Sequence, residues 1–281
     1  MRIAVCQFAA GTDVAENTRT CVALIGRAAE QGADLAVLPE VSMYFDPKHT
    51  DGPGPHGQRL DGPFAAAIAD AASSGGIAVL AGMLETAVGD TAGDTDAPDG
   101  AARDFNTLIA ISARGERIGQ YRKIHLYDAF GFRESNLYLA GAIEAPLLFD
   151  VAGVTVGALT CYDLRFPEAF RWVVDAGADV VALPAAWIAG PAKEQHWATL
   201  LAARAIENTV YVAGAGQTGP VCCGQSMIVD PAGAVVAGAG AAPGIAIADI
   251  DPQRVAAVRA TNPSLANRRF TVMPVIPAAA R

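Results

Sequence analysis

Short apolar runs alternate with longer amphipathic segments along the first part of the chain. Residues 2–8 (RIAVCQF) and 33–40 (ADLAVLPE) indicate strands, and residues 15–32 between them indicate a helix. A second helix over residues 64–76 is followed by a strand over residues 77–84. Apolar runs bounded by turn residues favour buried strands, whereas a 3.6-residue apolar period favours helices. The pattern therefore predicts successive strand–helix–strand units.

The second half of the chain repeats this organisation. Strand-like residues 105–112 and 115–126 flank a turn at Arg114 and Gly115, which is typical of a hairpin. Residues 88–104 are rich in Asp, Gly, Ala and Pro and predict a mobile loop within a hairpin, not a domain boundary. Residues 127–146 predict a long loop. The other expected elements are strands at 154–161, 178–187, 210–216, 224–230, 234–240 and 244–250, and helices at 168–177, 193–209 and 251–261. One large α/β domain with two similar halves is expected.

Composition and charge narrow the possible partners. The 281 residues are 52% hydrophobic and only 17% charged, which excludes a disordered or fibrous chain. The formal net charge of −9 gives no field that would gather polyanions, so nucleic acid is not an expected partner. No apolar stretch reaches the length of a membrane span. The apolar start of the chain could mimic a secretory signal, but it is short and is expected to be the first core strand.

The cysteines and histidines favour a reduced protein without a bound metal or cofactor. The five cysteines are an odd number in a chain much larger than a disulfide scaffold, so we expect a cytoplasmic protein. Cys222 and Cys223 are adjacent and indicate packing residues. The four histidines lack the paired spacing of metal ligands. His125 and His196 are expected either to line a pocket or to be hydrogen-bonded core residues.

A glycine motif at residues 214–219 (GAGQTG) matches the dinucleotide-binding pattern in its letters. That pattern requires a helix at the third glycine, whose amides bind the pyrophosphate, and an acidic residue about 20 positions later. Here Pro220 follows, and the chain continues towards another strand. The motif therefore does not predict a nucleotide site.

Four polar residues lie where predicted strands end or turn. Cys161 stands between an apolar run and Pro167, which suits the first turn of a helix. Glu40 ends a strand, Lys123 ends the predicted hairpin, and Glu134 lies in the long loop. Each has a plain alternative, since free cysteines are usually buried packing residues and single Glu or Lys side chains are usually solvated. Together, a thiol, a carboxylate and an ammonium would supply a nucleophile, a general base and an oxyanion partner.

The order of these residues resembles the nitrilase superfamily of carbon-nitrogen hydrolases, whose signature is a Glu-Lys-Cys triad. Glu40 lies in LAVLPE, Lys123 in YRKIHLYD and Cys161 in ALTCYDLRFPE. The resemblance continues through ADVVALPAAW, HWATLLAARAIENTVYVAGAGQTG, GQSMIVDPAGAVVA and NPSLANRR, and so covers nearly the whole chain. The segment CYDLRFPE resembles the Nit-type branch, which comprises ω-amidases and deaminated-glutathione amidases, more than true nitrilases.

The resemblance implies a role for each of these residues. Cys161 would be the nucleophile, Glu40 the general base and acid, and Lys123 the oxyanion stabiliser, while Glu134 would match the second glutamate of the family. The backbone N–H of Tyr162 would complete the oxyanion site. The family often has His at the position of Gln225, a difference expected to affect packing or substrate fit. Pocket-shaping roles, with plain packing as the alternative, are expected for Tyr44, Phe130, Phe132 and Trp187.

The family fold implied is a four-layer α-β-β-α sandwich. Residues 1–262 would form the hydrolase domain, and residues 263–281 a tail that packs on a neighbouring subunit of a homodimer or larger homo-oligomer. The expected reaction is hydrolysis of a small linear amide through a thioester. Two alternatives are an N-carbamoyl amino-acid amidohydrolase and an inactive binding or scaffold protein with the same fold.

Overall fold

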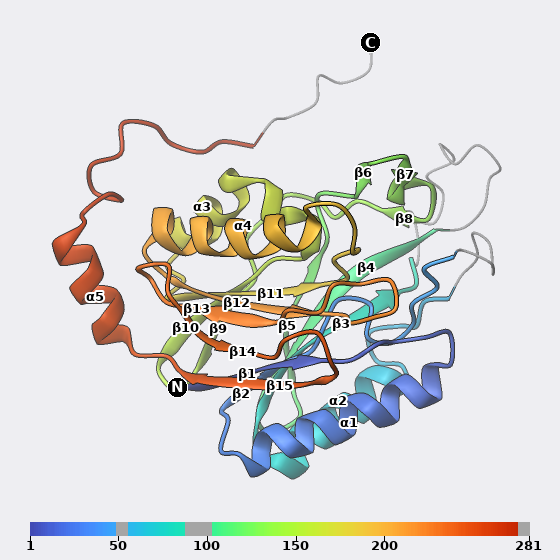
Figure 1. Ribbon diagram of the computed structural model, residues 1–281. Coiled ribbons are helices and arrows are strands. Elements are labelled where there is room, and N and C mark those ends of the chain that lie inside the picture. Colours follow the sequence, from blue (N-terminus) through green and yellow to red (C-terminus); the bar gives the residue numbers. More distant parts are fainter. Residues whose placement is uncertain (49–55, 88–102, 275–281) are drawn as a thin grey trace.

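Two β-sheets form the centre of the computed structural model, which describes residues 1–48, 56–87 and 103–274 (Figure 1). The first sheet has the strand order β15-β1-β2-β3-β4-β5, with β8 beside β4, and the second has the order β14-β13-β12-β11-β10-β9. The strands of the first sheet are β1 (Arg2–Gln7), β2 (Leu35–Val37), β3 (Ala78–Glu85), β4 (Asp104–Ile111), β5 (Arg117–Arg122), β8 (Tyr138–Leu139) and β15 (Gly244–Asp249). Those of the second are β9 (Leu148–Val151), β10 (Val154–Ala158), β11 (Val180–Ala185), β12 (Tyr211–Gly216), β13 (Met227–Val229) and β14 (Val235–Gly238).

Each sheet contains three parallel strands joined by helical crossovers. Strands β1, β2 and β3 are parallel neighbours, and the chain passes between them through α1 (Val14–Glu30) and α2 (Pro63–Gly75). Strands β10, β11 and β12 repeat this through α3 (Pro167–Asp175) and α4 (Lys193–Asn208). The antiparallel pairs β3–β4 and β4–β5 confirm both predicted hairpins, although residues 88–102 of the first connection lie outside the described residues. The two predicted α/β halves are therefore confirmed.

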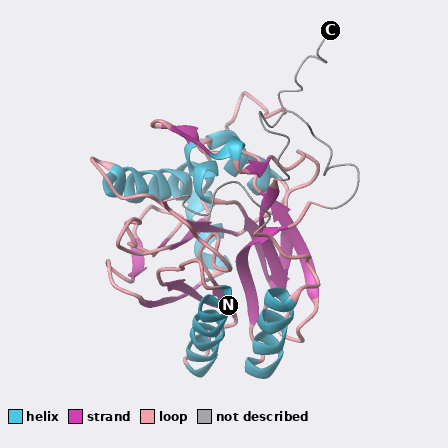
Figure 2. Cartoon of the chain, turned by 90° about the vertical axis from the view of Figure 1, so that its right-hand side faces the viewer, coloured by secondary structure: helices cyan, strands magenta, loops and turns pink. Residues whose placement is uncertain are grey.

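The side-chain alternation of the first sheet separates two apolar cores. In β1, Ile3 and Val5 pack with residues of the second sheet, whereas Ala4 and Cys6 pack with residues of α1 and α2. Successive strand residues point to opposite faces of a sheet, so one strand contributes to both cores. In Figure 1, α3 and α4 lie above the sheets and α1 and α2 lie below them, and Figure 2 shows helices on both outer sides from a second direction. This arrangement agrees with the expected α-β-β-α order.

Local sequence explains where the helices begin and end. The side chain of Asp13 accepts a hydrogen bond from the backbone of Glu16 at the start of α1. Pro63 and Pro167 occupy the first turns of α2 and α3, where a missing N–H costs no hydrogen bond. Beyond α2, Gly76 adopts the left-handed conformation that closes the helix.

Two parts of the fold differ from the sequence prediction. Strand β9 (Leu148–Val151) was not expected. It pairs antiparallel with β10 across a tight turn. The predicted loop at 127–146 contains the small hairpin β6 (Asp128–Ala129) and β7 (Phe132–Arg133), followed by a 3₁₀ turn η2 (Glu134–Asn136) and β8. These elements are too short to give a periodic pattern.

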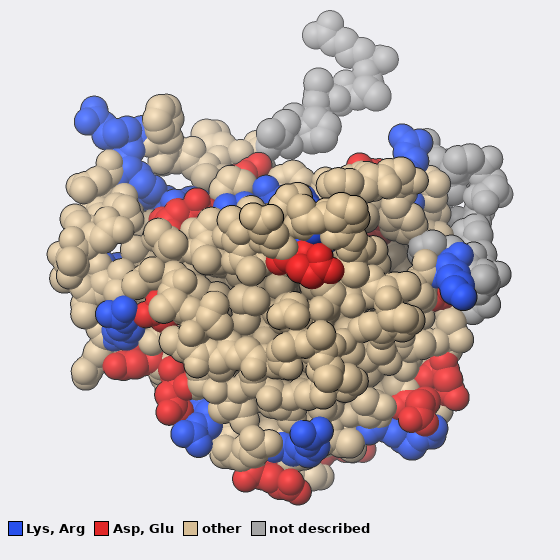
Figure 3. Space-filling view, viewed as in Figure 1, with Lys and Arg blue, Asp and Glu red and all other residues tan. Residues whose placement is uncertain are grey.

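The C-terminal part of the chain returns to the first sheet and then leaves it. Strand β15 pairs antiparallel with β1, and α5 (Pro252–Thr261) follows. The described tail then runs towards the α3 side of the molecule (Figure 1). On the face seen in Figure 3, positive and negative side chains are interspersed around a broad uncharged area. Within the described ranges, no helix has the length and apolarity needed to cross a membrane.

Candidate active site

Three turns bring Glu40, Lys123 and Cys161 together at one edge of the two sheets. Glu40 follows β2, Lys123 directly follows β5, and Cys161 begins the 3₁₀ turn η3 (Cys161–Arg165) beyond β10. Ligands of open α/β sheets bind beyond the carboxyl ends of the strands, where such turns converge. The side chains of Glu40, Lys123 and Glu134 are 3%, 2% and 6% exposed, so the expected alternative of solvated surface groups is wrong.

The ammonium of Lys123 joins two carboxylates. Its Nζ lies 2.8 Å from Glu40 Oε1 and 2.9 and 2.8 Å from the two oxygens of Glu134. Nδ2 of Asn106 donates to the same two side chains, at 2.8 Å to Glu40 Oε1 and 3.2 Å to Glu134 Oε1. Two carboxylates and one ammonium leave the cluster with one net negative charge. The Cys161 thiol lies close enough to this cluster that Glu40, after burial, raises its pKa.

Glu40 is held by both halves of the fold. Its Oε2 accepts the backbone N–H of Ala186, at the end of β11, at 2.6 Å, and its carbonyl oxygen accepts from Gln217 Nε2 at 2.9 Å. The turn packs so closely on β3 that a Cβ at Gly82 would lie 2.7 Å from Glu40 Cα. Only glycine allows this approach. The orientation of the carboxylate is therefore fixed by the backbone as well as by Lys123.

Cys161 occupies a strained turn that a buried aspartate holds in place. Its φ of 44° lies in the left-handed region, which non-glycine residues rarely adopt. Asp163 is fully buried and accepts hydrogen bonds from the Thr160 N–H at 2.8 Å and the Tyr121 hydroxyl at 2.7 Å. Nδ1 of His125 lies 2.7 Å from its other oxygen. His125 is thus a hydrogen-bonding residue beside the turn.

The charge state of Cys161 differs from what its proximity to a lysine suggests. A cysteine near one ammonium is expected to be partly ionised at neutral pH. In the structure, burial raises the pKa of the Cys161 thiol well above its ordinary value, the charge of Glu40 raises it further, and Lys123 offsets only part of this. Burial first, and then the charge of Glu40, therefore favour the protonated thiol over a resting thiolate, although Lys123 is nearby.

An aromatic group lies next to Cys161. The ring of Tyr162, the residue after the cysteine, meets the ring of Tyr127 edge-on at 5.0 Å. Tyr127 in turn contacts Phe130 and Phe132, each at 6.1 Å between ring centroids. Three of the residues expected to shape a pocket thus lie near the cysteine or its neighbours: Phe130, Phe132 and Trp187, the last being the residue after Ala186. Tyr44 instead stacks on His56 at 4.4 Å.

Several residues of the site were not identified from the sequence. Asn106 is 1% exposed in a strand whose residues are all buried, and such a buried polar side chain is a signal that could have been used. Lys193 and Arg165 gave no signal, because basic residues near helix starts and in turns are usually solvated. Lys193 is nevertheless only 8% exposed.

Other sequence motifs take the plain roles expected of them. The glycine motif ends β12 without a following helix. Cys222 and Cys223 are buried at 4% and 7% exposure. Gln225 has a φ of 55°, and its carbonyl oxygen accepts the Trp197 indole N–H at 2.8 Å, so this position shapes the backbone after β12.

Comparison with known proteins identifies similar chains. The chain is 40% identical over 270 residues to a deaminated glutathione amidase of Escherichia coli O157:H7, covering 96% of this chain and 98% of that protein. A deaminated glutathione amidase of Bos taurus is 33% identical and matches 95% of this chain and 81% of its own length.

Solved structures show the same fold with an active-site cysteine. The C. elegans NitFhit protein superposes with a TM-score of 0.84 at 30% identity, covering 96% of this chain but 66% of that longer chain. A mutant amidase from Nesterenkonia sp. AN1 has a TM-score of 0.76 at 27% identity, with 96% and 94% of the two chains covered. In that structure the acetamide moiety of fluoroacetamide is covalently added to the active-site cysteine. The sequence pattern of the Carbon-nitrogen hydrolase family matches residues 2–260, and the chain belongs to this family.

Proposed function

We propose that the protein is an amidase in which Cys161 attacks the carbonyl carbon of a small linear amide. The observation that carries this is the position of a buried thiol against a Glu40–Lys123–Glu134 ion cluster. Since the resting thiol is protonated, Glu40 must accept its proton as the sulfur attacks. Lys123 and the backbone N–H of Tyr162 stabilise the oxyanion, and Glu134 holds Lys123 in position.

The reaction proceeds in two halves. In the first, the C–S bond forms, Glu40 passes the thiol proton to the leaving nitrogen, and ammonia or an amine departs from the thioester. In the second, Glu40 removes a proton from water, the resulting oxygen attacks the thioester, and the sulfur leaves with a proton returned from Glu40. The product is a carboxylic acid and the enzyme is restored. Tyr127 donates its backbone N–H to Glu134 at 2.5 Å and so fixes the second carboxylate during both halves.

The substrate class that the relatives favour is an ω-amide of the deaminated-glutathione type. Two relatives that align over most of this chain are named deaminated glutathione amidases. The two alternatives, an N-carbamoyl amino-acid amidohydrolase and an inactive scaffold, share the same fold. A complete Glu40, Lys123 and Cys161 set argues against the inactive scaffold.

The test is an ammonia-release assay over short ω-amides, α-keto-acid amides, nitriles and N-carbamoyl amino acids. We expect release from the ω-amides, and hydroxylamine added to the assay should divert product to the hydroxamate through the thioester. Mass spectrometry should find the acyl group on the Cys161 peptide. Amide hydrolysis that survives Cys161→Ala, or a profile limited to nitriles, would contradict the proposal.

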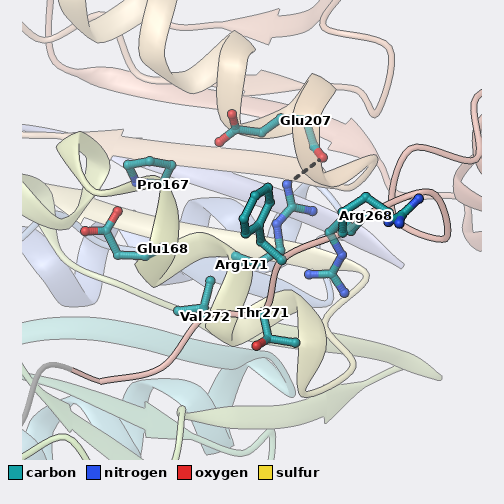
Figure 4. Close-up of a pocket in the computed structure, with 9 residues that line it drawn as sticks. Pro167, Glu168, Arg171, Glu207, Arg268, Thr271 and Val272 are labelled. Carbon is teal, nitrogen blue, oxygen red and sulfur yellow. Dashed lines mark hydrogen bonds between the residues drawn. The ribbon is translucent and has the colours of Figure 1, made fainter.

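We further propose that the enzyme is a homo-oligomer whose contact surface includes the tail after Asn262. Arg268 pairs with Asp175 at the end of α3, at 2.8 Å. Phe270 and Met273 are 90% and 79% exposed, which a monomer has little reason to maintain. Figure 4 shows the tail beside α3, where it helps to line a surface pocket formed by Pro167, Glu168, Arg171, Glu207, Arg268, Arg269, Phe270, Thr271 and Val272.

Removal of the tail tests this assembly. A chain ending at Asn262 should have a lower mass by light scattering than the full chain at the same concentration, because exposed apolar side chains no longer contact a neighbour. A full-length monomer at micromolar concentration would contradict the proposal.

We place the enzyme in the cytoplasm, because its five cysteines are all free thiols.

A further inference from the structure

Lys193 is a buried cation whose described side-chain contacts are a hydroxyl and aromatic rings. It is 8% exposed at the first position of α4, and its Nζ donates a hydrogen bond to the Tyr127 hydroxyl at 2.9 Å. Its other neighbours are aromatic rings, at 4.3 Å from the centroid of Phe130, 5.0 Å from Tyr127 and 5.3 Å from Trp187. Within the part of the chain that the structure describes, no carboxylate forms an ion pair with Lys193. Ring faces attract a cation but do not neutralise it.

A second cation shares the same rings. The guanidinium of Arg165 lies 4.9 Å from the Trp187 ring and 5.5 Å from that of Phe130. Its Nε and Nη2 are buried and have no hydrogen-bond partner among the described residues. Lys193 also stands at the positive end of the α4 dipole, where a cation is unfavourable, and the N-cap residue Ala192 has no side-chain acceptor. Among the described residues, neither Lys193 nor Arg165 forms an ion pair with a carboxylate, although Glu194 follows Lys193 in the first turn of α4.

This group adjoins the catalytic cluster. The Tyr127 side chain reaches Lys193 through its hydroxyl, while the backbone N–H of the same residue binds Glu134. The Tyr127 ring also packs edge-on against Tyr162, next to Cys161. On the other side, Trp187 follows Ala186, whose N–H binds Glu40. Tyr127 and Trp187 thus connect the surroundings of Cys161 with those of Lys193, so a small substrate at Cys161 could also contact Lys193.

We propose that Lys193 and the Tyr127 hydroxyl form a subsite for a carboxylate of the substrate and select carboxylate-bearing amides over neutral ones. Because the tyrosine hydroxyl accepts the lysine's hydrogen bond, its own hydrogen is available to donate. Two donors 2.9 Å apart suit the two oxygens of one carboxylate. The arriving anion compensates the buried ammonium, which explains why the site tolerates one. This inference rests on the proposed function. It adds that the enzyme recognises a carboxylate of the substrate away from the amide bond that is cleaved.

The first test compares two substrates that differ only in charge. Ammonia release is measured with glutaric acid monoamide and with its methyl ester, which lacks the carboxylate. Lys193→Met should lower kcat/KM for the monoamide by about ten- to a hundredfold, mainly through KM, and leave that for the ester within about threefold. Lys193→Arg should retain most of the preference. Tyr127→Phe keeps the lysine and should lower kcat/KM for the monoamide by about two- to tenfold. Lys48→Met, which removes an exposed lysine, is the matched control and should leave kcat/KM for both substrates unchanged.

A binding measurement separates this inference from the proposed chemistry. Calorimetry with glutarate uses Cys161→Ser, which cannot form the thioester, with and without Lys193→Met; the second change should weaken binding at least about tenfold. Equal glutarate affinity in the two proteins would overturn the subsite. An equal decrease in kcat/KM for the monoamide and for its methyl ester, in Lys193→Met and in Tyr127→Phe, would also overturn it. Glutarate binding that depends on Lys193, in a wild-type protein that releases ammonia from neither amide, supports the subsite and contradicts the proposed function instead.

Discussion

Two of the three lysines of this chain are buried, and their surroundings are opposite. Lys123 is 2% exposed and contacts Glu40 and Glu134, each within 2.9 Å. Lys193 is 8% exposed and contacts one hydroxyl and three aromatic rings. Burying a charge is expensive unless a partner compensates it. Lys123 has its compensation built into the fold, and the proposed partner of Lys193 arrives with the substrate.

The difference separates two uses of the same side chain. An ammonium between two carboxylates is held in place and offsets only part of the rise in the thiol pKa, so it suits a group that must act on charge appearing during the reaction. An ammonium among rings remains available to an incoming anion. Their spatial neighbours, and not the residue type, distinguish the two.

Replacement of each buried lysine by methionine should have the largest effects, and the effects on stability should differ between the two positions. Lys123→Met leaves Glu40 and Glu134 facing each other without a cation, so turnover should fall at least about a hundredfold, and the free energy of unfolding should fall by about 3–5 kcal/mol. Lys193→Met removes an uncompensated charge, so its free energy of unfolding should be unchanged or higher. Urea denaturation and amide turnover measure both variants. A similar loss of stability in the two would show that the lysines are not electrostatically different.

Glu40→Gln should change hydrolysis and alkylation in opposite directions. Turnover should fall on the order of a hundredfold, because the general base is lost. Burial is the main cause that raises the pKa of Cys161 and the Glu40 charge is the next, so removal of that charge lowers the thiol pKa while burial still raises it. The thiolate fraction at pH 7 then rises, and iodoacetamide should label Cys161 faster than in the wild type.

Labelling is followed by mass spectrometry of the Cys161 peptide at several pH values. In the wild type the rate should still be rising above pH 9, since the raised pKa keeps the thiol protonated at lower pH. Cys6 is an internal control, because burial raises its pKa to about 12. Slower labelling of Glu40→Gln would mean that the carboxylate does not hold the thiol in its protonated form.

The smallest effect is expected for Asn106→Ala, which acts through the two glutamates. The variant loses the hydrogen bonds of Nδ2 to Glu40 and Glu134. A loss of positioning should lower kcat by about tenfold and leave KM almost unchanged, because Asn106 acts through its hydrogen bonds to the two carboxylates. Steady-state kinetics distinguishes this from a binding role, in which KM would rise instead.

The order of most helices and strands, and the side chains proposed to react, could be predicted from the amino-acid pattern. The periodic segments at 15–32 and 193–209 are helices in the structure, and the apolar runs at 2–8 and 178–187 contain strands. Glu40, Lys123, Glu134 and Cys161 could be singled out because turns after buried strands are visible in the local pattern and because their order resembles a known signature.

The surroundings of each of these side chains depend on how distant segments pack together. The pairing of β15 with β1, residues more than 200 positions apart in sequence, closes the first sheet. Asn106 between two carboxylates, the protonated thiol of Cys161 and the rings around Lys193 all depend on contacts between distant segments. Local periodicity reports which face of an element is apolar. The charge state of a buried group depends on how much water is excluded and which charges remain beside it, and both are set only when the segments pack.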